Sequence, residues 1–324
     1  MNNYYIGIDL GGTNIKSAIF NTNFEKISEH RVQTHADKGS DVVLSRMLNS
    51  IEELLKSSRI YASEILCMGI GVPGLLDTKT GISKFSPNFS KWENVHVSQW
   101  FETKLKIPTF IDNDVRMNLY GEWYYGEGKG KSNVVLITLG TGLGSGVIID
   151  GHVLYGTTGS VGEIGHMNMY RSGRPCRCGS YGCLGRYVSA IGMLRTLKEK
   201  LQNGNTSVIH DWVQGDYDKI TAKMVSDAFD KGDKVAIDTF YETGELLGYG
   251  LANVINLYNP ECIIIGGGMA AAGERLLKSA RKIVDTHALQ ISNDTCEIVI
   301  ASLGDSSGML GAAIYASNHR RKEK

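Results

Sequence analysis

Apolar and polar residues alternate along the chain in blocks that predict a mixture of strands and helices. Tyr4–Asp9 and Lys16–Phe20 are short apolar runs with the composition of strands, and a polar glycine turn joins them. Between residues 41 and 58 the apolar positions recur at helical spacing, which predicts an amphipathic helix. Three more elements are expected in this part of the chain: strands at Ile65–Val72 and Thr109–Asp112, and a helix from Val115.

A polar segment at residues 127–133 indicates a boundary or hinge. Strands at Val134–Leu139 and Val147–Asp150 then flank a second glycine turn, so the pattern of the chain's start recurs. Residues 203–217 are expected to be a solvated loop, and the basic end Arg320–Lys324 to fray. The other expected elements are helices within 186–202 and 221–256, after Gly273 and at Gly308–Ala316, and strands at Cys262–Ile265 and Ile298–Ala301. Strands interspersed with helices predict the α/β class.

Composition excludes several classes of protein. The chain has 324 residues, enough for two units with separate cores. Cationic and anionic side chains number 34 each, so no net field would attract nucleic acid or an anionic membrane. No apolar stretch is long enough to cross a membrane, and the N-terminus lacks the basic start of a signal peptide. Six cysteines in so long a chain do not form a secreted disulfide framework, so a cytoplasmic location is expected.

Two glycine-threonine turns are candidate phosphate-binding loops. Glycine lets the main chain approach a phosphate, and the turn leaves N–H groups free to donate to it. Asp9, at the end of the first strand, is placed to hold Mg²⁺ directly or through water. Plain hairpin turns are the alternative interpretation. The residues concerned are Gly11, Gly12, Thr13, Gly140, Thr141 and Gly142, with Gly266, Gly267 and Gly268 as a weaker candidate for adenosine contact.

Two better-known nucleotide motifs do not fit the sequence. The segment Gly130–Ser132 has the end of a P-loop, but Tyr125 stands where that motif requires glycine. The glycines from Gly140 to Gly146 are followed by a strand, whereas a dinucleotide-binding unit continues into a helix. The pattern therefore disfavours both fold types.

One histidine and three cysteines form a candidate zinc site. Three thiolates and one imidazole make a complete tetrahedral set, and nearby glycines allow the tight turns that bring them together. Such a closed site folds a loop and activates no water. Unligated, reduced cysteines are the alternative. The four residues are His166, Cys176, Cys178 and Cys183, while Cys67, Cys262 and Cys296 lie singly in apolar runs and are expected to be inert core residues.

Carboxylates at element ends are candidates for acid–base chemistry. Asp112-Asn113-Asp114 stands where a strand ends and a helix begins. A kinase needs a carboxylate to accept a hydroxyl proton, and Asp114 is the candidate base, with Asn113 as a hydrogen-bonding partner of the sugar. Helix capping is the alternative role for this segment. Glu163 is a candidate hydroxyl ligand on the loop that the zinc site would stiffen, and a solvated surface glutamate is the alternative.

Taken together, these motifs resemble the ROK (repressor, ORF, kinase) family and look most like its Gram-positive-type glucokinases. The similar segments are Ile8–Asn14, Asp112–Asp114, Leu139–Gly142 and Glu163–His166 with the cysteine cluster, in the family's order over nearly the whole chain. The resemblance implies an actin-like (ribonuclease H-like) fold of two α/β domains with a cleft between them. It implies a small domain of residues 1–119 and 306–324, to which the last helix returns, and a large domain of residues 120–305 with the zinc-binding loop.

The resemblance also implies an activity and a set of site residues. The activity is transfer of the γ-phosphoryl group of ATP, usually to the 6-hydroxyl of a hexose, by a homodimer that uses Mg²⁺ and structural Zn²⁺. Asp114 is the implied catalytic base. The implied sugar-binding residues are Gly74, Asn88, Asn113, Asp114, Glu163 and His166; the nucleotide-binding ones Asp9, Gly11, Gly12, Thr13, Lys16, Gly140, Thr141, Gly142, Gly267 and Gly268; and the zinc ligands His166, Cys176, Cys178 and Cys183.

Two positions depart from the family's pattern. Gly185 stands where a glutamate usually contacts the sugar near its anomeric end, and Arg116 stands where a small amide is usual. The hypothesis that follows is a substrate modified near C1 or C2, such as a glycoside, an amino sugar or an N-acetyl sugar. A non-catalytic, sugar-responsive regulator is the alternative. A DNA-binding repressor is disfavoured because only three residues precede Tyr4 and the charge is balanced.

Overall fold

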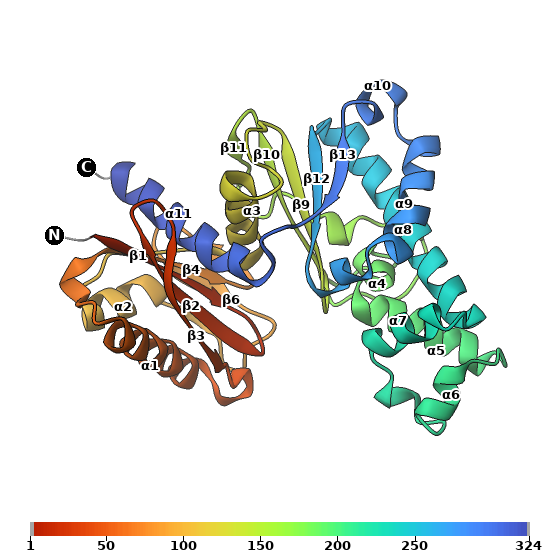
Figure 1. The fold of residues 1–324 in the computed structure, drawn as a ribbon, viewed down its shortest axis with the longest axis horizontal. Helices are drawn as coiled ribbons and strands as arrows, with labels where there is room; N and C mark the ends of the chain where they lie inside the picture. Colours follow the sequence, from red (N-terminus) through yellow and green to blue (C-terminus); the bar gives the residue numbers. More distant parts are fainter. Residues whose placement is uncertain (1–2, 323–324) are drawn as a thin grey trace. The chain divides into compact units, whose positions relative to one another are not determined.

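A computed structural model of the chain describes residues 3–322. These residues form two compact units, the first made of residues 3–130, 154–161 and 302–322 and the second of residues 131–153 and 162–301. Each unit is built on a five-stranded sheet, drawn in Figure 1. In the described part of the chain, no helix is both long and apolar enough to span a bilayer.

The sheet of the first unit has the strand order β3-β2-β1-β4-β8. Its first three strands form an antiparallel meander, and β4 and β8 run parallel to β1. Asp9 therefore lies level with Gly71 on β4, and Gly71 with Asp112 on β8, at the edge where the parallel strands end. The strands are β1 (Tyr4–Leu10), β2 (Asn14–Asn21), β3 (Lys26–Gln33), β4 (Ile65–Val72) and β8 (Thr109–Asn113).

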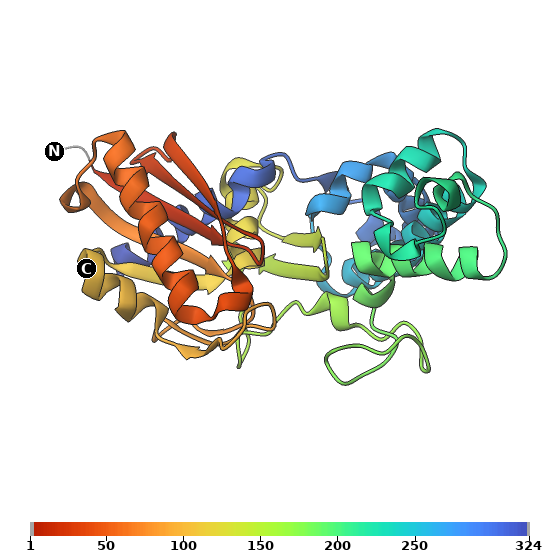
Figure 2. The same cartoon turned by 90° about the horizontal axis from the view of Figure 1, so that it is seen from below.

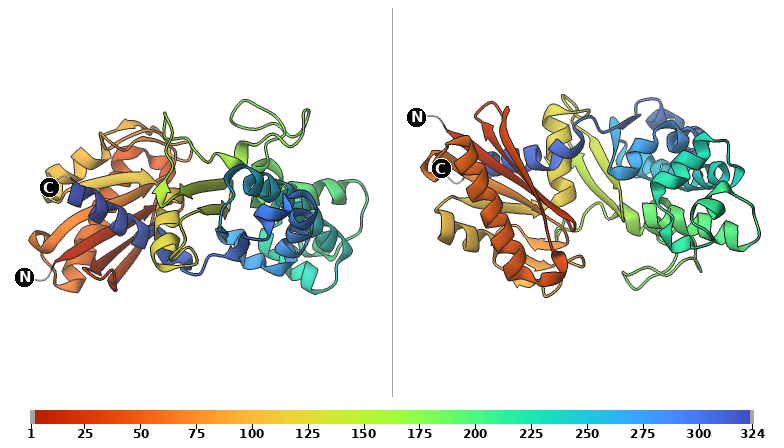
Figure 3. Two further views of the ribbon diagram at one scale, coloured as in Figure 1. Left: turned by 90° about the horizontal axis from the view of Figure 1, so that it is seen from above. Right: turned by 60° about the horizontal axis from the view of Figure 1, so that its bottom comes forward.

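Helices cover both faces of this sheet. Strand side chains alternate between the faces, so Ile6 and Ile8 join the core formed with α1 and α2, and Tyr5 joins the core formed with α11. Helix α11 lies very close to the sheet, because a Cβ on Gly7 would come 1.8 Å from a carbonyl oxygen of α11. Figure 3 shows this last helix, in blue, beside the strands of the first unit. The helices are α1 (Ser40–Ser58), α2 (Val97–Leu105), α3 (Asp114–Tyr125) and α11 (Ser307–Lys322).

Short elements complete the first unit. A small antiparallel sheet has the order β5-β6-β7 and follows directly on the end of β4. These elements are β5 (Leu75–Asp77), β6 (Ile82–Phe85), β7 (Glu93–Val95) and the 3₁₀ turns η1 (Ala36–Lys38), η2 (Ala62–Glu64) and η6 (Gly304–Ser306).

The sheet of the second unit repeats the topology of the first. Its order is β11-β10-β9-β12-β13, with an antiparallel meander followed by two strands parallel to β9. The strands are β9 (Val134–Leu139), β10 (Leu143–Ile149), β11 (His152–Val153), β12 (Cys262–Gly266) and β13 (Glu297–Ile300). The helices and 3₁₀ turns are η3 (Ile164–His166), α4 (Gly185–Val188), α5 (Ala190–Gln202), α6 (Val208–Trp212), η4 (Tyr217–Lys219), α7 (Ala222–Asp230), α8 (Lys234–Tyr258), η5 (Gly268–Ala272), α9 (Glu274–His287) and α10 (Gln290–Asn293).

The structure corrects two expectations from the sequence and bears out a third. Residues 203–217 are not simply a loop, because they contain α6, whose Ile209 is buried. The helices expected within 221–256 are α7 and α8, and Asp233 begins α8 by accepting a hydrogen bond from the Ala236 N–H. The basic end is not frayed at Arg320, which lies in α11 and donates to the carbonyl of Leu66. Residues 323–324 lie outside the described part of the chain.

Candidate functional site

The first glycine turn leaves two backbone donors free. The Gly11 N–H donates to the Asn14 carbonyl at 3.0 Å, and Thr34 ties the turn down through bonds to the Gly11 and Thr13 carbonyls. The N–H groups of Gly12 and Thr13 donate to no residue in the described part of the chain, and both residues are exposed. The turn is therefore rigid and still presents two donors, which is what binding of a phosphate requires.

The second glycine turn has the same character. Gly140 donates to the Gly142 carbonyl at 2.9 Å, whereas the N–H groups of Thr141 and Gly142 have no partner among residues 3–322. A Cβ on Gly140 or Gly142 would meet nothing within 4 Å, so the space beside the turn is open. The backbone of Gly267 packs against the end of β9, because a Cβ added to Gly267 would lie 2.5 Å from the Leu139 carbonyl oxygen. Its φ of +80° is a second reason for glycine at this position.

Asp9 and Lys16 lie next to the first turn. The Lys16 ammonium is 4.0 Å from the Asp9 carboxylate and 2.8 Å from that of Asp305, a residue that the sequence did not indicate. Burial raises the pKa of Asp9, and Lys16 opposes this rise only in part. A divalent cation at Asp9 would offset the cost of burying this charge, so the donor fits a Mg²⁺ ion, which binds proteins through one or two carboxylates.

Asn113 and Asp114 occupy the junction of β8 and α3. The Asn113 side chain caps α3 by accepting hydrogen bonds from the N–H groups of Val115 and Arg116, so the capping role left open by the sequence is real for this residue. Its amide nitrogen lies 3.5 Å from the Gly74 carbonyl. The cap fixes the first turn of α3 and with it the backbone of Asp114.

Asp114 has the electrostatics of a general base. Burial of the carboxyl, followed by the negative charge of Asp9, raises the pKa of Asp114 to about 7. The Val115 N–H donates to this carboxyl at 3.0 Å and limits the rise. A carboxyl with a pKa near neutrality is both available as a base and strong enough to take a proton from a hydroxyl group.

Gly74 and Asn88, both predicted to bind sugar, lie in the first unit near these groups. Gly74 has a φ of +101°, and a Cβ there would lie 2.2 Å from the Phe85 carbonyl oxygen, so no other residue fits. Asn88 is exposed, and its Cβ would be 3.8 Å from a Cβ on Gly12. The first unit thus brings the glycine turn and Asn88 together.

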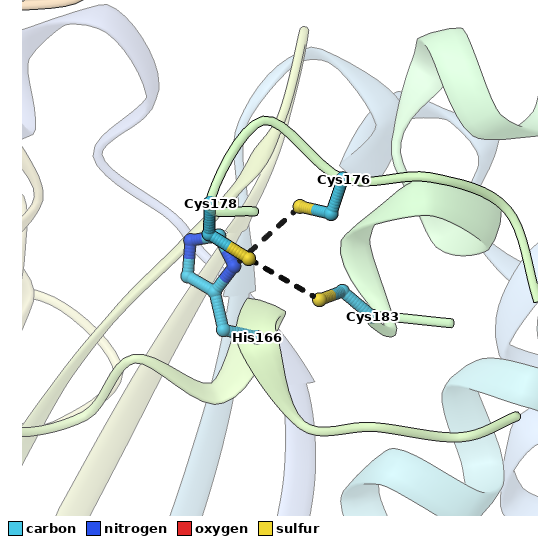
Figure 4. Close-up of side chains that lie close together, drawn as sticks. All are labelled: His166, Cys176, Cys178 and Cys183. Carbon is cyan, nitrogen blue, oxygen red and sulfur yellow. Dashed lines mark hydrogen bonds between the residues drawn. The ribbon is translucent and has the colours of Figure 1, made fainter. Parts of the chain in front are cut away.

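The four predicted zinc ligands converge in the second unit, as Figure 4 shows. Their ligand atoms lie within 4.8 Å of one another, with 3.7 Å between Cys178 Sγ and Cys183 Sγ and 3.7 Å between Cys176 Sγ and His166 Nδ1. A tetrahedron with Zn–S bonds of about 2.3 Å has edges of about 3.8 Å, so the donor set fits zinc in number, chemistry and spacing. In Figure 2 the segment that carries the cysteines is a long loop with few regular elements.

The surroundings of the four ligands are consistent with a structural metal site. The Ser180 N–H, the first of several donors, lowers the pKa of Cys178 to about 7, which favours the thiolate that a metal binds. On the far side of the imidazole, His166 Nε2 lies 3.9 Å from the Glu163 carboxylate, so the two ring nitrogens face different partners. Of the three other cysteines, Cys67 and Cys262 are buried as expected, whereas Cys296 is only partly buried.

A buried ion pair near Asp114 was missing from the sequence-based site. Arg116 bonds the Asp112 carboxylate through Nε and a terminal nitrogen, both at 2.7 Å. The Tyr155 hydroxyl donates to the same carboxylate at 2.6 Å, and its ring lies under the guanidinium. The sequence pattern assigns no role to Asp112, and it does not reveal that this carboxylate is completely buried.

Comparison with known proteins identifies the family to which this chain is similar. The ROK family model matches residues 5–319. A glucokinase from Halalkalibacterium halodurans is 35% identical over 312 residues, which cover 95% of this chain and 93% of that enzyme. A xylose repressor from Caldicellulosiruptor bescii is 30% identical over 94% of this chain and 76% of the repressor.

Among solved structures, a ROK family glucokinase from Streptomyces griseus in complex with glucose and AMPPNP is similar throughout. Its TM-score is 0.83 at 30% identity, and the match covers 98% of this chain and 100% of that one. This likeness confirms the actin-like fold of two α/β domains that the resemblance implied. Because the family model and these relatives match nearly all of its length, the chain belongs to the ROK family.

Proposed function

We propose that this protein transfers the γ-phosphoryl group of ATP to the 6-hydroxyl of a hexose or hexose derivative. The class of enzyme, an ATP-dependent sugar kinase, is confirmed by the glucokinases that match nearly the whole chain. The observation that carries the finer proposal is Asp114, with a pKa of about 7, at the same sheet edge as the first glycine turn.

Asp114 acts as the base in this proposal. Its carboxylate accepts the proton of the attacking hydroxyl while the hydroxyl oxygen bonds to the γ-phosphorus and the bond to the ADP oxygen breaks. The products are the sugar phosphate, ADP and a protonated Asp114 that returns its proton to solvent. Because Asn113 caps the helix that starts at Asp114, the carboxylate is held in place before the substrate arrives.

Phosphates are bound by backbone donors in this proposal. The free N–H groups of Gly12 and Thr13 in the first unit, and of Thr141 and Gly142 in the second, hold phosphate oxygens. When bound, Mg²⁺ supplies positive charge that offsets the charge of the phosphates, and Asp9 would hold it. Further nucleotide contacts are assigned to Lys16, Gly11, Gly140, Gly267 and Gly268.

Sugar contacts are assigned to residues that flank Asp114 and the zinc site. In the first unit these are Gly74, Asn88 and Asn113, and in the second unit Glu163 and His166. Zinc, when bound, would fix the His166 ring through Nδ1 and leave Nε2 for a hydroxyl group. A homodimer in the cytoplasm stays a prediction for the whole protein.

Residue 185 supports a modified sugar as the substrate. Gly185 begins α4 and packs on the turn that precedes His166, because its Cβ would lie 3.3 Å from the Gly165 carbonyl oxygen. No carboxylate extends from this position. A substituent at C1 or C2, such as an N-acetyl group, would occupy the space that the absent glutamate side chain leaves.

A panel of sugars in an assay coupled to ADP release tests the proposal. Glucose, glucosamine, N-acetylglucosamine and a methyl glucoside are compared by kcat/KM, and the product's phosphate position is read by NMR. We expect a modified sugar to exceed glucose by tenfold or more, because one charge-assisted hydrogen bond is worth about 1.5–3 kcal/mol. Phosphate at another hydroxyl would overturn the regiochemistry, and a strong preference for free glucose would overturn the modified-sugar hypothesis.

Gly185→Glu and Gly185→Gln make a matched pair for the same question. Both add a similar volume, and the few tenths of an ångström that the Gly165 carbonyl must give are common to both. Only Glu restores a carboxylate, so only Glu should raise kcat/KM for glucose relative to the modified sugars. Equal effects of the two substitutions would show that shape and not charge sets the preference.

A sugar-responsive regulator without catalysis is the second candidate, because a xylose repressor matches 94% of this chain. Sugar-dependent ADP release at a rate that falls in Asp114→Asn would exclude it. Sugar binding by calorimetry without turnover on any member of the panel would favour it over the kinase.

A further inference from the structure

A cavity of about 660 Å³ lies in the first unit, and no residue assigned above to sugar or nucleotide lines it. Its walls come from the β5–β6 hairpin, the start of α3, the segment 154–161 and the end of α11. Small-molecule sites in proteins have volumes of about 300–1,000 Å³, so the cavity has the size of a ligand site. None of Gly74, Asn88, Asn113 and Asp114 lines it.

The charged groups of this cavity are mainly cationic. Lys79, Lys84 and Arg116 line it, against the single carboxylate of Asp77. That carboxylate is 3.8 Å from the Lys84 ammonium, and no ion pair is formed by Lys79 within the described residues. Asp112 also neutralises Arg116, so Lys79 is the cation of this cavity that has no carboxylate partner among the described residues.

One wall of the cavity consists of unused hydrogen-bond donors. The N–H groups of Gly156, Thr157, Thr158 and Gly159 donate to no partner in the described part of the chain. Two of these residues also bring hydroxyl groups. Free donors beside cations are typical of a wall that binds oxyanions.

Arg116 forms the floor of the cavity and is only 7% exposed. A guanidinium has five N–H groups. Among described residues, three contacts engage them, two to Asp112 and one to the Gly159 carbonyl at 2.8 Å. The two that remain lie in a buried position, where a donor without an acceptor is costly. A ligand with oxygen acceptors would satisfy them.

We propose that this cavity binds a small organic anion, a sugar-sized molecule that carries a phosphate or carboxylate group. The anionic group meets Lys79, Lys84 and the remaining Arg116 donors, and hydroxyl groups of the ligand meet the threonines of the 154–161 wall. The site is separate from the one that the proposed kinase activity uses.

Binding at this cavity would reach the catalytic segment through short, direct contacts. Arg116 lies two residues after Asp114 in the first turn of α3, and its partner Asp112 lies two residues before it. The wall segment is held by the same pair, since Tyr155 donates to Asp112 and Arg116 donates to Gly159. The wall also continues along the chain into Glu163. A bound anion therefore stabilises one arrangement of these contacts, which makes the cavity a candidate effector site.

Calorimetry on the full chain with two probes tests the proposal: glucose 6-phosphate and glucuronate. Titrations are run with AMPPNP and an excess of the panel sugar that has the highest kcat/KM, so that binding at the proposed active site is blocked. We expect glucose 6-phosphate or glucuronate to bind under these conditions, and the two probes distinguish a phosphate ligand from a carboxylate ligand. The paired change Lys79→Gln with Lys84→Gln should weaken this binding at least tenfold.

A matched control carries the same loss of charge elsewhere on the first unit. Lys56 and Lys129 are exposed and do not line the cavity, so Lys56→Gln with Lys129→Gln should leave the affinity unchanged. Thr158→Val should weaken the binding without a change of charge. The proposal is overturned by no binding of either anion, by binding that the blocking sugar and AMPPNP abolish, or by equal weakening in the cavity pair and the control pair.

Discussion

Replacing Asp114 with asparagine should separate catalysis from stability. The substitution keeps the shape of the side chain and removes its ability to take a proton, so turnover should fall by about 10²–10⁴-fold while sugar affinity changes little. The ordinary pKa of this carboxyl is 3.8, and burial together with the charge of Asp9 raises it to about 7. A rise of about three units corresponds to roughly 4 kcal/mol. Since the side chain is partly exposed, solvent screens part of this energy, and about 1–3 kcal/mol is a realistic magnitude.

The direction of the stability change in Asp114→Asn follows from whether the folded or the unfolded chain holds the Asp114 proton more tightly. Below about pH 4 both the folded and the unfolded wild type are protonated at Asp114, and the variant and the wild type should be alike. Between pH 4 and pH 7 the unfolded chain loses this proton while the folded chain keeps it, so the wild type loses stability as the pH rises through 7. Asparagine does not titrate. Asp114→Asn should therefore raise the free energy of unfolding at pH 8 by about 1–3 kcal/mol, and by much less at pH 5.

Denaturant unfolding at pH 5 and pH 8, beside the coupled assay at pH 8, measures both effects. Asp230→Asn is a suitable control, because Arg275 lowers the pKa of Asp230 and its replacement should lose stability at pH 8. The reasoning fails if Asp114→Asn retains turnover, or if its gain in stability is equal at the two pH values.

Four other outcomes are expected. Wild-type kcat/KM should fall about tenfold per unit below pH 7 as Asp114 is protonated, and a flat profile down to pH 5 would contradict the raised pKa. Removal of zinc by a chelator should lower the thermal midpoint of the wild type, and Cys183→Ser should show a lower midpoint that the chelator no longer changes. Arg116→Met leaves the buried Asp112 carboxylate unpaired and should cost about 3–5 kcal/mol in denaturant unfolding. Gly267→Ala places a Cβ 2.5 Å from the Leu139 carbonyl oxygen, so ATP affinity measured by calorimetry should fall, and an unchanged affinity would remove Gly267 from the nucleotide site.

Local pattern was enough to predict the buried central strands of the two five-stranded sheets. The predicted strands Tyr4–Asp9 and Ile65–Val72 correspond to β1 and β4. Both were recognisable because apolar residues dominate them, and both are largely buried in the structure. Strand β3 (Lys26–Gln33) was not predicted. It lies at the edge of the sheet, is partly exposed along its length, and has no apolar run to mark it. Helix α6 was missed for a similar reason, since only Ile209 in it is buried.

The zinc ligands were predictable because their chemistry and spacing are local. His166 and the three cysteines span 18 residues and need only tight turns to meet. The role of Arg116 was not predictable, because it depends on Tyr155 and Gly159, which lie about 40 residues away and reach it only through the folded chain. Asp305 was missed for the same reason, since its partner Lys16 is 289 residues distant.

The duplicated sheet gives the two units similar glycine turns, to both of which the proposed function assigns phosphate binding. In each unit the first hairpin turn follows a strand, β1 or β9. One later strand pairs with it in parallel, and a second parallel strand pairs with that one. The turn therefore stands at the edge where all three parallel strands end, and side chains from those strand ends gather beside it. In the first unit these side chains are the carboxylates of Asp9, Asp112 and Asp114, whereas in the second unit β12 ends in glycines. In the proposed function, the same backbone would support proton transfer in one unit and close approach of a nucleotide in the other. Replacing either turn should then weaken ATP binding, whereas only the first unit would supply the base.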